Sequence, residues 1–353
     1  MEQEGERDPM KILMILPEFE EGGVERHVLW LSTELSTLGH TVSLVTAGGR
    51  LEEKLPPGVR VIHLPVHRKN PLTAFFSALR IASIARRETY DLLHAHSRVP
   101  AWIAWWASCF SGKPWTVTAH DRYRKNGAIG PFRKADGAIC VSEAVCSHLG
   151  GFLPVKTAVI RNGIPDPAAS WRRKEASVPF RFLFVGRLTR RKGLHVALSA
   201  LSAVTESPWV LDILGDGPQR EELEAMAANL GLGEKVLFHG FRDEVGTWMA
   251  ASDCLLFPSF DEGMPLTLMQ GIRVGIPVLA SKIEPVMELV GSHEALLPAG
   301  DVPVWANRLL EIFHEGKILP RFDPAIVPTA RQMAEKTIGF LEDVRANWIS
   351  REG

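Results

Sequence analysis

The sequence, 353 residues long, predicts an α/β protein made of two Rossmann-like domains that face each other across a cleft. Short apolar runs typical of buried parallel strands alternate with amphipathic helical patterns along the chain. A polar stretch rich in Pro, Ala and Ser at residues 165–179 interrupts this alternation once. The chain is too long for one ordinary core and suits two domains of about 150–180 residues.

The interruption sets the expected boundaries: a first domain at 1–166, a linker at 167–179, a second domain at 180–330 and a last helical segment at 331–353. The composition, 46% apolar and 23% charged, is that of a globular protein. Four cysteines show no CxxC or Cys/His metal spacing, so we expect reduced thiols in the core: Cys109, Cys140, Cys146 and Cys254.

The start of the chain and its apolar runs bear on location. Residues 2–8 are acidic rather than basic, so we expect no signal peptide. The longest apolar run, residues 100–110, falls well short of the ~20 residues of a membrane span. We therefore expect a cytoplasmic protein that is at most peripheral, on the inner face of the plasma membrane.

Charge is unevenly distributed. Residues 22–165 hold 18 Lys and Arg against 9 Asp and Glu, a net charge of +9 in a chain whose overall net charge is −1. A basic first domain suits an anionic partner such as a phospholipid surface, a lipid phosphate or nucleic acid. The alternative is a solvated face with scattered counter-ions.

In the first domain the pattern predicts strands at residues 11–16, 41–46, 61–64, 92–96, 115–119 and 137–141, and helices at 24–38, 72–87 and 100–109. Ser142 caps a further helix that Glu143 opens. Gly22 and Gly23 lie between the first strand and its helix, as in a phosphate-facing turn, although a plain tight turn explains two glycines equally well. Trp102, Trp105 and Trp106 are expected to pack in the core or an interface, with lipid contact as the alternative.

Two strands of this domain end in histidines. His120 stands with Asp121 at the carboxyl end of its strand, where catalytic groups collect, so we select His120 as a site residue. His94 and His96 are expected to be mainly structural. A loop with Gly127 and Gly130 follows, and the density of its cations suggests contact with phosphate or a membrane headgroup: Arg122, Arg124, Lys125, Arg133 and Lys134.

In the second domain we expect strands at residues 180–185, 210–214, 235–238, 254–257 and 278–280, and helices at 219–230, 243–251, 264–272, 302–314 and 331–349. Asp301 is expected to cap the helix at 302–314. Arg187 and Lys192 follow the first of these strands beside a helix start. Two such cations and a helix N-terminus can neutralise a diphosphate, whereas the alternative is a solvated basic turn.

The stretch at residues 258–281 combines a loop, a helix, a turn and a buried strand. Asp261, Glu262 and Gly263 follow a strand, and ligands of open α/β sheets bind beyond the carboxyl ends of strands. The backbone N–H groups at the helix start are expected to hold an anionic group: those of Met264, Leu266 and Thr267. The sequence therefore predicts a site here.

This stretch resembles the signature of the retaining glycosyltransferases of family 4, in which two acidic residues with seven residues between them precede a Gly-x-Pro-Val strand. Glu262 stands at the first acidic position, whereas Gln270 stands where the family has its second Glu. The resemblance extends over most of the chain, through the Val-Gly-Arg…Lys-Gly segment at 185–193, the strand with Ser-Glu at 139–144 and the Asn-Gly turn at 162–163. It implies a GT-B fold whose C-terminal helix crosses back to the first domain.

The resemblance also implies the site. The catalytic residues would be His120, Glu262, Arg187 and Lys192. The donor-binding residues would be Gly22, Gly23, Arg187, Lys192, Gly215, Gly217, His239, Gly240, Phe241, Glu262, Gly263, Met264, Pro265, Leu266, Thr267 and Gln270. Gln270 can still accept a hydrogen bond from a ribose hydroxyl through its amide oxygen, without the charge of Glu.

The implied activity is a retaining hexosyl transfer from a UDP- or GDP-sugar to a hydroxyl of a glycan or lipid-linked acceptor, as in polysaccharide or lipopolysaccharide biosynthesis. We expect no metal and no cofactor, because two cations already face the phosphates and no DxD-type acidic pair is evident. We expect no nucleic-acid partner. Two alternatives remain: a nucleotide-sugar epimerase of the same two-domain build, which needs acid/base carboxylates, and a catalytically silent nucleotide-sugar binder, for which Gln270 is the hint.

Overall fold

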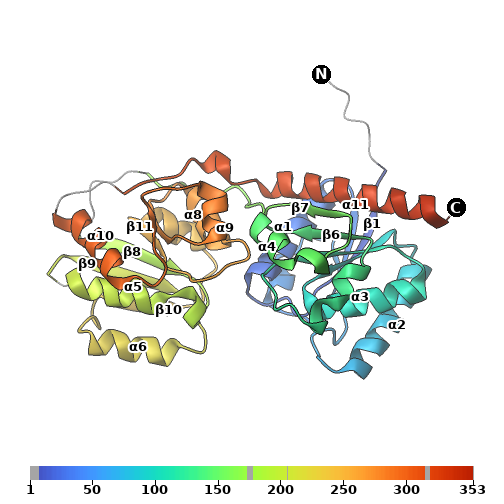
Figure 1. Cartoon of the computed structure of the whole chain (residues 1–353), viewed down its shortest axis with the longest axis horizontal. Coiled ribbons are helices and arrows are strands. Elements are labelled where there is room, and N and C mark those ends of the chain that lie inside the picture. Colours follow the sequence, from blue (N-terminus) through green and yellow to red (C-terminus); the bar gives the residue numbers. More distant parts are fainter. Residues whose placement is uncertain (1–7, 173–177, 205, 315–318, 353) are drawn as a thin grey trace, which may run out of the picture. The chain divides into compact units, whose positions relative to one another are not determined.

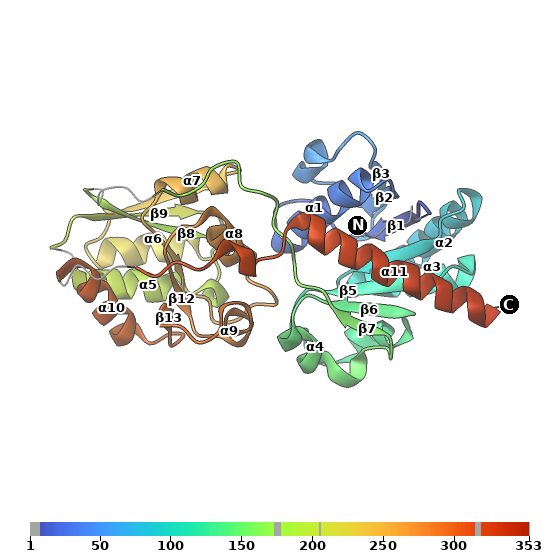
Figure 2. The same cartoon turned by 90° about the horizontal axis from the view of Figure 1, so that it is seen from above.

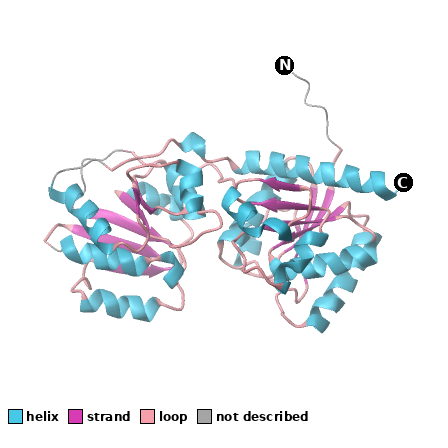
Figure 3. Ribbon diagram, in the orientation of Figure 1, coloured by secondary structure: helices cyan, strands magenta, loops and turns pink. Residues whose placement is uncertain are grey.

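The computed structural model describes residues 8–172, 178–204, 206–314 and 319–352 (Figure 1). The chain divides into two compact units, residues 1–165 with 328–353, and residues 166–327. Each unit has its own parallel sheet with helices against it, shown in magenta and cyan in Figure 3. The acidic opening residues 2–7 lie outside the described residues. No helix of the described part is long and apolar enough to cross a membrane.

The first unit contains a seven-stranded parallel sheet in the order β3-β2-β1-β4-β5-β6-β7. Its strands are β1 Lys11–Ile15, β2 Thr41–Thr46, β3 Arg60–His63, β4 Leu92–His96, β5 Trp115–Ala119, β6 Gly137–Cys140 and β7 Thr157–Val159. Its α-helices are α1 Gly23–Thr37, α2 Pro71–Arg87, α3 Arg98–Ser111, α4 Glu143–Leu149 and α11 Ala330–Glu352. Ser142 caps α4, since its hydroxyl accepts from the Val145 N–H at 3.2 Å.

The C-terminal helix α11 is part of the first unit (Figure 2). Its apolar side joins the core that α1 and the sheet form, through Met333, Ala334, Ile338, Leu341 and Val344. Gly137 at the start of β6 permits the close approach, because a Cβ there would lie 2.6 Å from Val344 Cγ2. The expected return of the last helix to the first domain is therefore confirmed.

The second unit contains a six-stranded parallel sheet in the order β10-β9-β8-β11-β12-β13. Its strands are β8 Phe180–Val185, β9 Trp209–Leu214, β10 Val236–Gly240, β11 Cys254–Phe257, β12 Val278–Ser281 and β13 Leu296–Leu297. Its α-helices are α5 Leu194–Leu201, α6 Arg220–Asn229, α7 Val245–Ala251, α8 Leu266–Val274, α9 Glu284–Val290 and α10 Val302–His314. Asp301 caps α10, since its Oδ1 accepts from the Val304 N–H at 3.2 Å.

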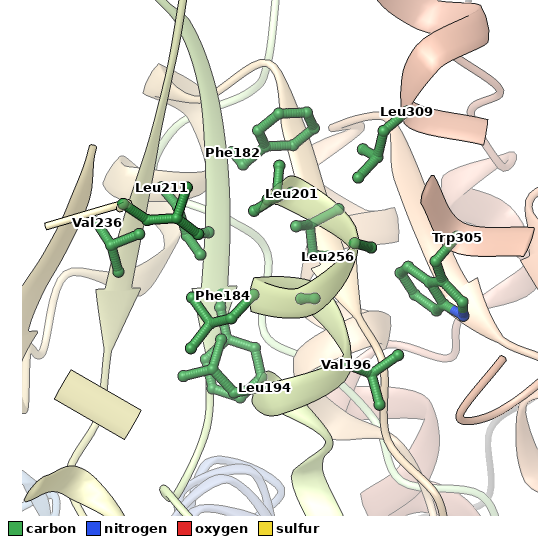
Figure 4. Packing of buried hydrophobic residues seen from close by; sticks show 14 of the residues in the cluster. Phe182, Phe184, Leu194, Val196, Leu201, Leu211, Val236, Leu256, Trp305 and Leu309 are labelled. Atoms are coloured by element: carbon green, nitrogen blue, oxygen red, sulfur yellow. The ribbon is translucent and has the colours of Figure 1, made fainter. Parts of the chain in front are cut away.

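The core of the second unit lies between the sheet and the helices α5 and α10. Phe182, Leu211 and Leu256 come from three neighbouring strands, and Trp305 and Leu309 come from α10 (Figure 4). Burying each such side chain contributes about 1.5–3 kcal/mol. This core fixes the sheet whose carboxyl edge carries the candidate donor residues.

The predicted linker is only partly described. Residues 173–177 lie outside the described residues, but the segment before them is anchored to the second unit. The Trp171 backbone N–H donates to the Val274 carbonyl at 2.8 Å, and its indole N–H donates to the Ser252 carbonyl at 2.9 Å. A single tryptophan in a polar run gives no periodic pattern, so the sequence did not predict this contact.

Two expectations about the first domain were wrong. The cationic loop is a 3₁₀-helical segment, Gly127–Lys134, because Ile129 and Phe132 are buried and Asn126 Oδ1 accepts from the Ala128 N–H at 3.0 Å. Of the four free cysteines, Cys140 and Cys254 are buried, but Cys109 is exposed, because it lies on the outward side of α3.

Candidate functional site

In each sheet the first strand lies in the middle, the second and third strands lie on one side of it, and the fourth lies on the other side. The chain therefore leaves the first and fourth strands toward opposite faces of the sheet. Ligands of open α/β sheets bind at this switch point, beyond the carboxyl ends of the strands. The switch point lies between β8 and β11 in the second unit, and between β1 and β4 in the first.

An ion pair joins the two loops at the switch point of the second unit. Lys192 Nζ donates to Glu262 Oε1 at 2.7 Å, from the turn Arg190–Lys192 after β8 to the loop after β11. The Glu262 residue is only 7% exposed, so its carboxylate depends on this cation for compensation. Both are residues that the sequence predicts for the site, and the structure brings them together.

Glycines let these loops touch through their backbones. Gly193 has a φ of +71°, and a Cβ there would overlap the Pro258 carbonyl oxygen. A Cβ at Gly215 would overlap the Gly186 carbonyl oxygen, and one at Gly217 would overlap that of Leu188. The residues predicted to bind the donor, Gly215 and Gly217, therefore also hold the loops after β8 and β9 together.

Two further cations near the carboxyl edge of this sheet, Arg187 and Arg191, differ in whether they form ion pairs. The Arg187 side chain is exposed and makes no ion pair with the residues that the structure describes. Arg191, in contrast, donates to the Asp261 carbonyl at 2.7 Å and lies 3.6 Å from its carboxylate. Arg187 can thus turn to an anionic ligand without breaking an ion pair with the described residues.

The helix after this loop starts later than expected. Helix α8 begins at Leu266 with Pro265 at the N-cap position, and Gly263 and Met264 lie buried before it. The prediction that the Leu266 N–H is ready for an anion was wrong, because it donates to the Met264 carbonyl at 3.0 Å. Thr267 lies in the first turn, where N–H groups lack intrahelical partners.

Gln270 lies one turn further along α8. Its side chain is half-buried and has no hydrogen-bond partner among the residues described. The structure therefore leaves its amide available to a ligand.

The predicted donor-binding residues His239, Gly240 and Phe241 lie at the carboxyl end of β10 in the same unit. His239 Nε2 lies 2.7 Å from Asp212 Oδ1, and its ring lies 4.6 Å from that of Trp248. The Gly240 carbonyl accepts from the Gly215 N–H at 2.8 Å, and Phe241 follows in the loop. The His239 side chain is thus already engaged within the unit, and donor binding by this loop stays a prediction.

The switch point of the first unit carries a histidine cluster: His27 on α1, His94 within β4, His96 at its end, and His120 after β5. His96 Nδ1 lies 3.1 Å from His120 Nε2, and the His27 and His120 ring centroids lie 4.7 Å apart. His27 Nδ1 lies 2.8 Å from Asn162 Oδ1. Sequence reasoning selected His120, regarded His96 as structural and missed His27, although the strand order brings their elements to one edge.

The histidines of this cluster are neutral at neutral pH. Burial lowers the pKa of His27 to about 4, against a smaller upward effect of the Asn162 hydrogen bond. Burial and the neighbouring imidazole of His27 lower the pKa of His94 to about 3. Burial also holds the pKa of His96 and of His120 well below the ordinary value.

In the described part of the chain, one group of side chains has the composition of a metal site, His27, His96 and His120, with nitrogens within 4.8 Å of one another. A tetrahedral ion with bonds of about 2.0–2.1 Å needs ligand nitrogens about 3.4 Å apart. Two of the cluster's nitrogens instead form the contact between His96 and His120. The spacing therefore fits a hydrogen-bonded cluster better than a formed metal centre.

The remaining predicted residues of the first unit lie at the start of α1, and in and just before the 3₁₀ segment. Gly22 is the extended N-cap of α1 and Gly23 its first residue. The cations occupy two short runs in which Arg122 is half-buried and the others are exposed: Arg124, Lys125, Arg133 and Lys134. Each unit thus carries part of the predicted set.

The two sheets with this strand order place the protein in the GT-B class. The crystal structure of Anabaena Alr3699/HepE in complex with UDP-glucose has the same fold, with a TM-score of 0.76 and 21% identity over 97% of this chain and 100% of that one. Residues 21–166 match the family model described as Glycosyltransferase Family 4, and residues 168–332 match that described as Glycosyl transferases group 1. The chain belongs to glycosyltransferase family 4.

Two curated relatives align over most of the chain. The 2-deoxystreptamine N-acetyl-D-glucosaminyltransferase of Streptomyces fradiae is 28% identical over 337 residues, 80% of each chain. The UDP-Gal:alpha-D-GlcNAc-diphosphoundecaprenol alpha-1,3-galactosyltransferase of Escherichia coli is 24% identical over 299 residues, 75% of this chain and 77% of that protein. For two other curated relatives the matched region spans only 60% and 48% of their length.

Proposed function

We propose that the protein is a retaining glycosyltransferase that moves a hexose from a nucleotide-diphosphate-sugar to a hydroxyl of a glycan or lipid-linked acceptor. The observation that carries the proposal is the switch point of the second unit, where Lys192 pairs with Glu262 and Arg187 has no ion-pair partner in the described part. This arrangement lies within the segment that matches the group 1 family model. Two neighbours, one named for UDP-Gal and one bound to UDP-glucose, favour a UDP-sugar over a GDP-sugar.

In the proposed chemistry the bond between the anomeric carbon and the donor phosphate oxygen breaks while the acceptor oxygen bonds on the same face. The departing diphosphate takes the acceptor proton, so the protein supplies charge stabilisation rather than a base. Arg187 and Lys192 stabilise the leaving phosphates. The Lys192 ammonium has three N–H donors, so it can keep its bond to Glu262 and still donate to a phosphate.

Glu262 and His120 complete the proposed catalytic set, one from each unit. We propose that Glu262 stabilises the positive charge that develops on the sugar ring. Burial holds the pKa of His120 well below its ordinary value, so we propose that His120 acts as a neutral hydrogen-bond partner. We propose a metal-independent reaction, because Arg187 and Lys192 already supply two positive charges at the diphosphate. The proposal also places the protein in the cytoplasm, peripherally on the membrane where the acceptor is lipid-linked.

The test is incubation with a panel of UDP- and GDP-sugars, with and without candidate acceptors, followed by measurement of free nucleotide and of the sugar. A transferase releases nucleotide when an acceptor is present. An epimerase interconverts the sugars without releasing nucleotide, and a silent binder does neither. Either of the last two results would overturn the proposal.

A further inference from the structure

Helix α2 exposes a row of large apolar side chains, although Ile81 and Ile84 are buried with its small residues. The buried residues include Ala74, Ala78 and Ala82, whereas Leu72 is 69% exposed and Phe76 is 66% exposed. The outward residues Leu72, Phe75, Phe76 and Leu79 follow the spacing i, i+3, i+4, i+7, so they form one stripe. Folding of a soluble domain favours the opposite arrangement, with large apolar side chains inside.

Helix α3 has a similar row of aromatic side chains outside, although Ile103 is buried with its small residues. Ala101, Ala104 and Ala107 are buried, whereas Trp102, Trp105 and Trp106 are half-exposed. The two helices lie side by side in both views of the molecule (Figures 1 and 2). Phe75 joins them, with its ring 6.1 Å from that of Trp106 and 5.7 Å from that of Phe110.

Together these helices form a continuous aromatic face, which we define as Phe75, Phe76, Trp102, Trp105, Trp106 and Phe110. Contiguous exposed apolar surface of this kind marks a binding site for another apolar surface. Its composition of Trp and Phe beside aliphatic side chains is typical of helices that lie in the interfacial region of a bilayer.

The segments that form or contact the aromatic face carry cations and no acids, although Glu88 and Asp121 directly adjoin them. Residues 71–87, 98–111 and 122–134 contain nine Lys and Arg and no Asp or Glu. The other cations of residues 22–165 equal its nine acids in number, so these segments account for the whole +9. The indole N–H of Trp102 donates to the Ala128 carbonyl at 3.1 Å, which fixes the aromatic face against the cationic 3₁₀ segment.

We propose that the aromatic face docks the first unit on the surface of an anionic bilayer. The aromatic rings enter the interfacial region, and the surrounding cations contact the headgroups, each contributing about a fivefold gain in affinity. A second protein surface is the less suitable occupant, because the net positive charge of these segments repels an identical copy and the cations need an anionic counterpart. The inference rests on the proposed function only in that docking brings the enzyme to a lipid-linked acceptor.

Co-sedimentation of the full chain with phosphatidylcholine vesicles, with and without phosphatidylglycerol, tests the docking. We expect binding that requires the anionic lipid and weakens with added salt. Leu72→Ser/Phe76→Ser removes the two most exposed side chains of the stripe, and it should lower vesicle affinity about tenfold or more. Ile349→Ser is the matched control, because Ile349 is 53% exposed on α11 of the same unit and should bind as the parent does. Lys125→Ser/Lys134→Ser should lower affinity for anionic vesicles, whereas Arg351→Ser on α11 should not.

Cys109 supplies a second readout, because its thiol is exposed on the outward side of α3. In a Cys146→Ser background, an environment-sensitive fluorophore on Cys109 should shift to shorter wavelength on anionic vesicles, and brominated lipid should quench it. Co-sedimentation with no change at Cys109 would overturn the proposal. Equal vesicle binding by Leu72→Ser/Phe76→Ser and the parent would overturn it as well. It would also be overturned if the parent bound no vesicle but formed a dimer that Leu72→Ser/Phe76→Ser dissociates.

Transfer to a water-soluble acceptor, measured without vesicles, separates this proposal from the proposed function. Vesicle binding without transfer would refute the transferase and leave the docking face standing. Transfer without vesicle binding would do the reverse.

Discussion

Replacement of Lys192 by Met separates the catalytic role of this residue from its structural one. The change removes the donor that lies 2.7 Å from Glu262 Oε1 and leaves a carboxylate only 7% exposed without its cation. A hydrogen bond to a charged group is worth about 1.5–3 kcal/mol. Because the Lys192 side chain is partly solvated, we expect the free energy of unfolding to fall by an amount near the lower end of that range. Transfer should fall by about 10²–10³, since one donor to the developing phosphate charge is lost.

Two companion variants make the test decisive. Lys192→Met/Glu262→Gln removes the stranded charge, so the melting temperature should recover in part while transfer stays low. Arg187→Met should slow transfer by a similar factor with no change in melting temperature, because the Arg187 side chain is exposed and makes no ion pair with the described residues. The measurements are the melting transition of the second unit and kcat at saturating donor. Near-parental turnover in both Arg187→Met and Lys192→Met would refute the reasoning.

Three further predictions concern the donor, metals and pH. Gln270→Ala should weaken donor binding by about 0.5–1.5 kcal/mol and Gln270→Glu should bind as tightly or tighter, by calorimetry; unchanged affinity in both would mean that Gln270 does not touch the donor. Transfer should survive EDTA, and a complete loss that Mg²⁺ or Mn²⁺ restores would contradict metal independence. Stability of the first unit should fall as pH drops from about 6.5 toward 4, because the unfolded chain takes up protons that buried His27 and His94 refuse, at about 1.4 kcal/mol per pKa unit. A melting temperature of that unit that stays constant from neutral pH to about pH 5 would count against this linkage.

The sequence predicted the long elements well because their patterns are strong. The strand Cys254–Phe257 has the expected bounds, since a strand buried on both faces is a continuous apolar run. Trp115–Ala119 has the expected bounds as well, since its Trp, Thr and Val residues favour strands. The strands Thr157–Val159 and Leu296–Leu297 are too short to form such a pattern and were missed. The helix Glu284–Val290 was missed as well, since it has seven residues and a Pro in its first turn.

Orientation was the harder property to predict. Trp102, Trp105 and Trp106 follow helical spacing, but the same spacing describes a stripe that faces inward or outward. Their half-exposed positions follow from the small residues on the opposite side of α3, which pack inward. Of the expected places, core or interface, the half-exposed positions exclude only a fully buried core.

Contacts between residues far apart in the chain could not be predicted from the sequence. The Lys192–Glu262 pair joins positions 70 residues apart, and motifs named both residues without indicating that they touch. His27 lies on a helix with no motif of its own, and its contact with Asn162 spans 135 positions. Such contacts depend on the strand order, which decides which loops meet at the carboxyl edge.

The first unit is built from two separate segments of the chain, and this affects folding during synthesis. Ile164 pairs with Thr329 in a parallel bridge, and the Ala330 N–H donates to the Ile164 carbonyl at 3.1 Å, so the chain leaves and re-enters this unit at adjoining points. During synthesis, residues 1–165 emerge first, but the core they form stays open on the side of α11 until residues 166–327 have also emerged. A ribosome-bound chain that ends at residue 165 should accordingly bind chaperones that recognise exposed apolar surface. Joining residue 165 directly to residue 328 should release a free-standing first domain that folds without the inserted one.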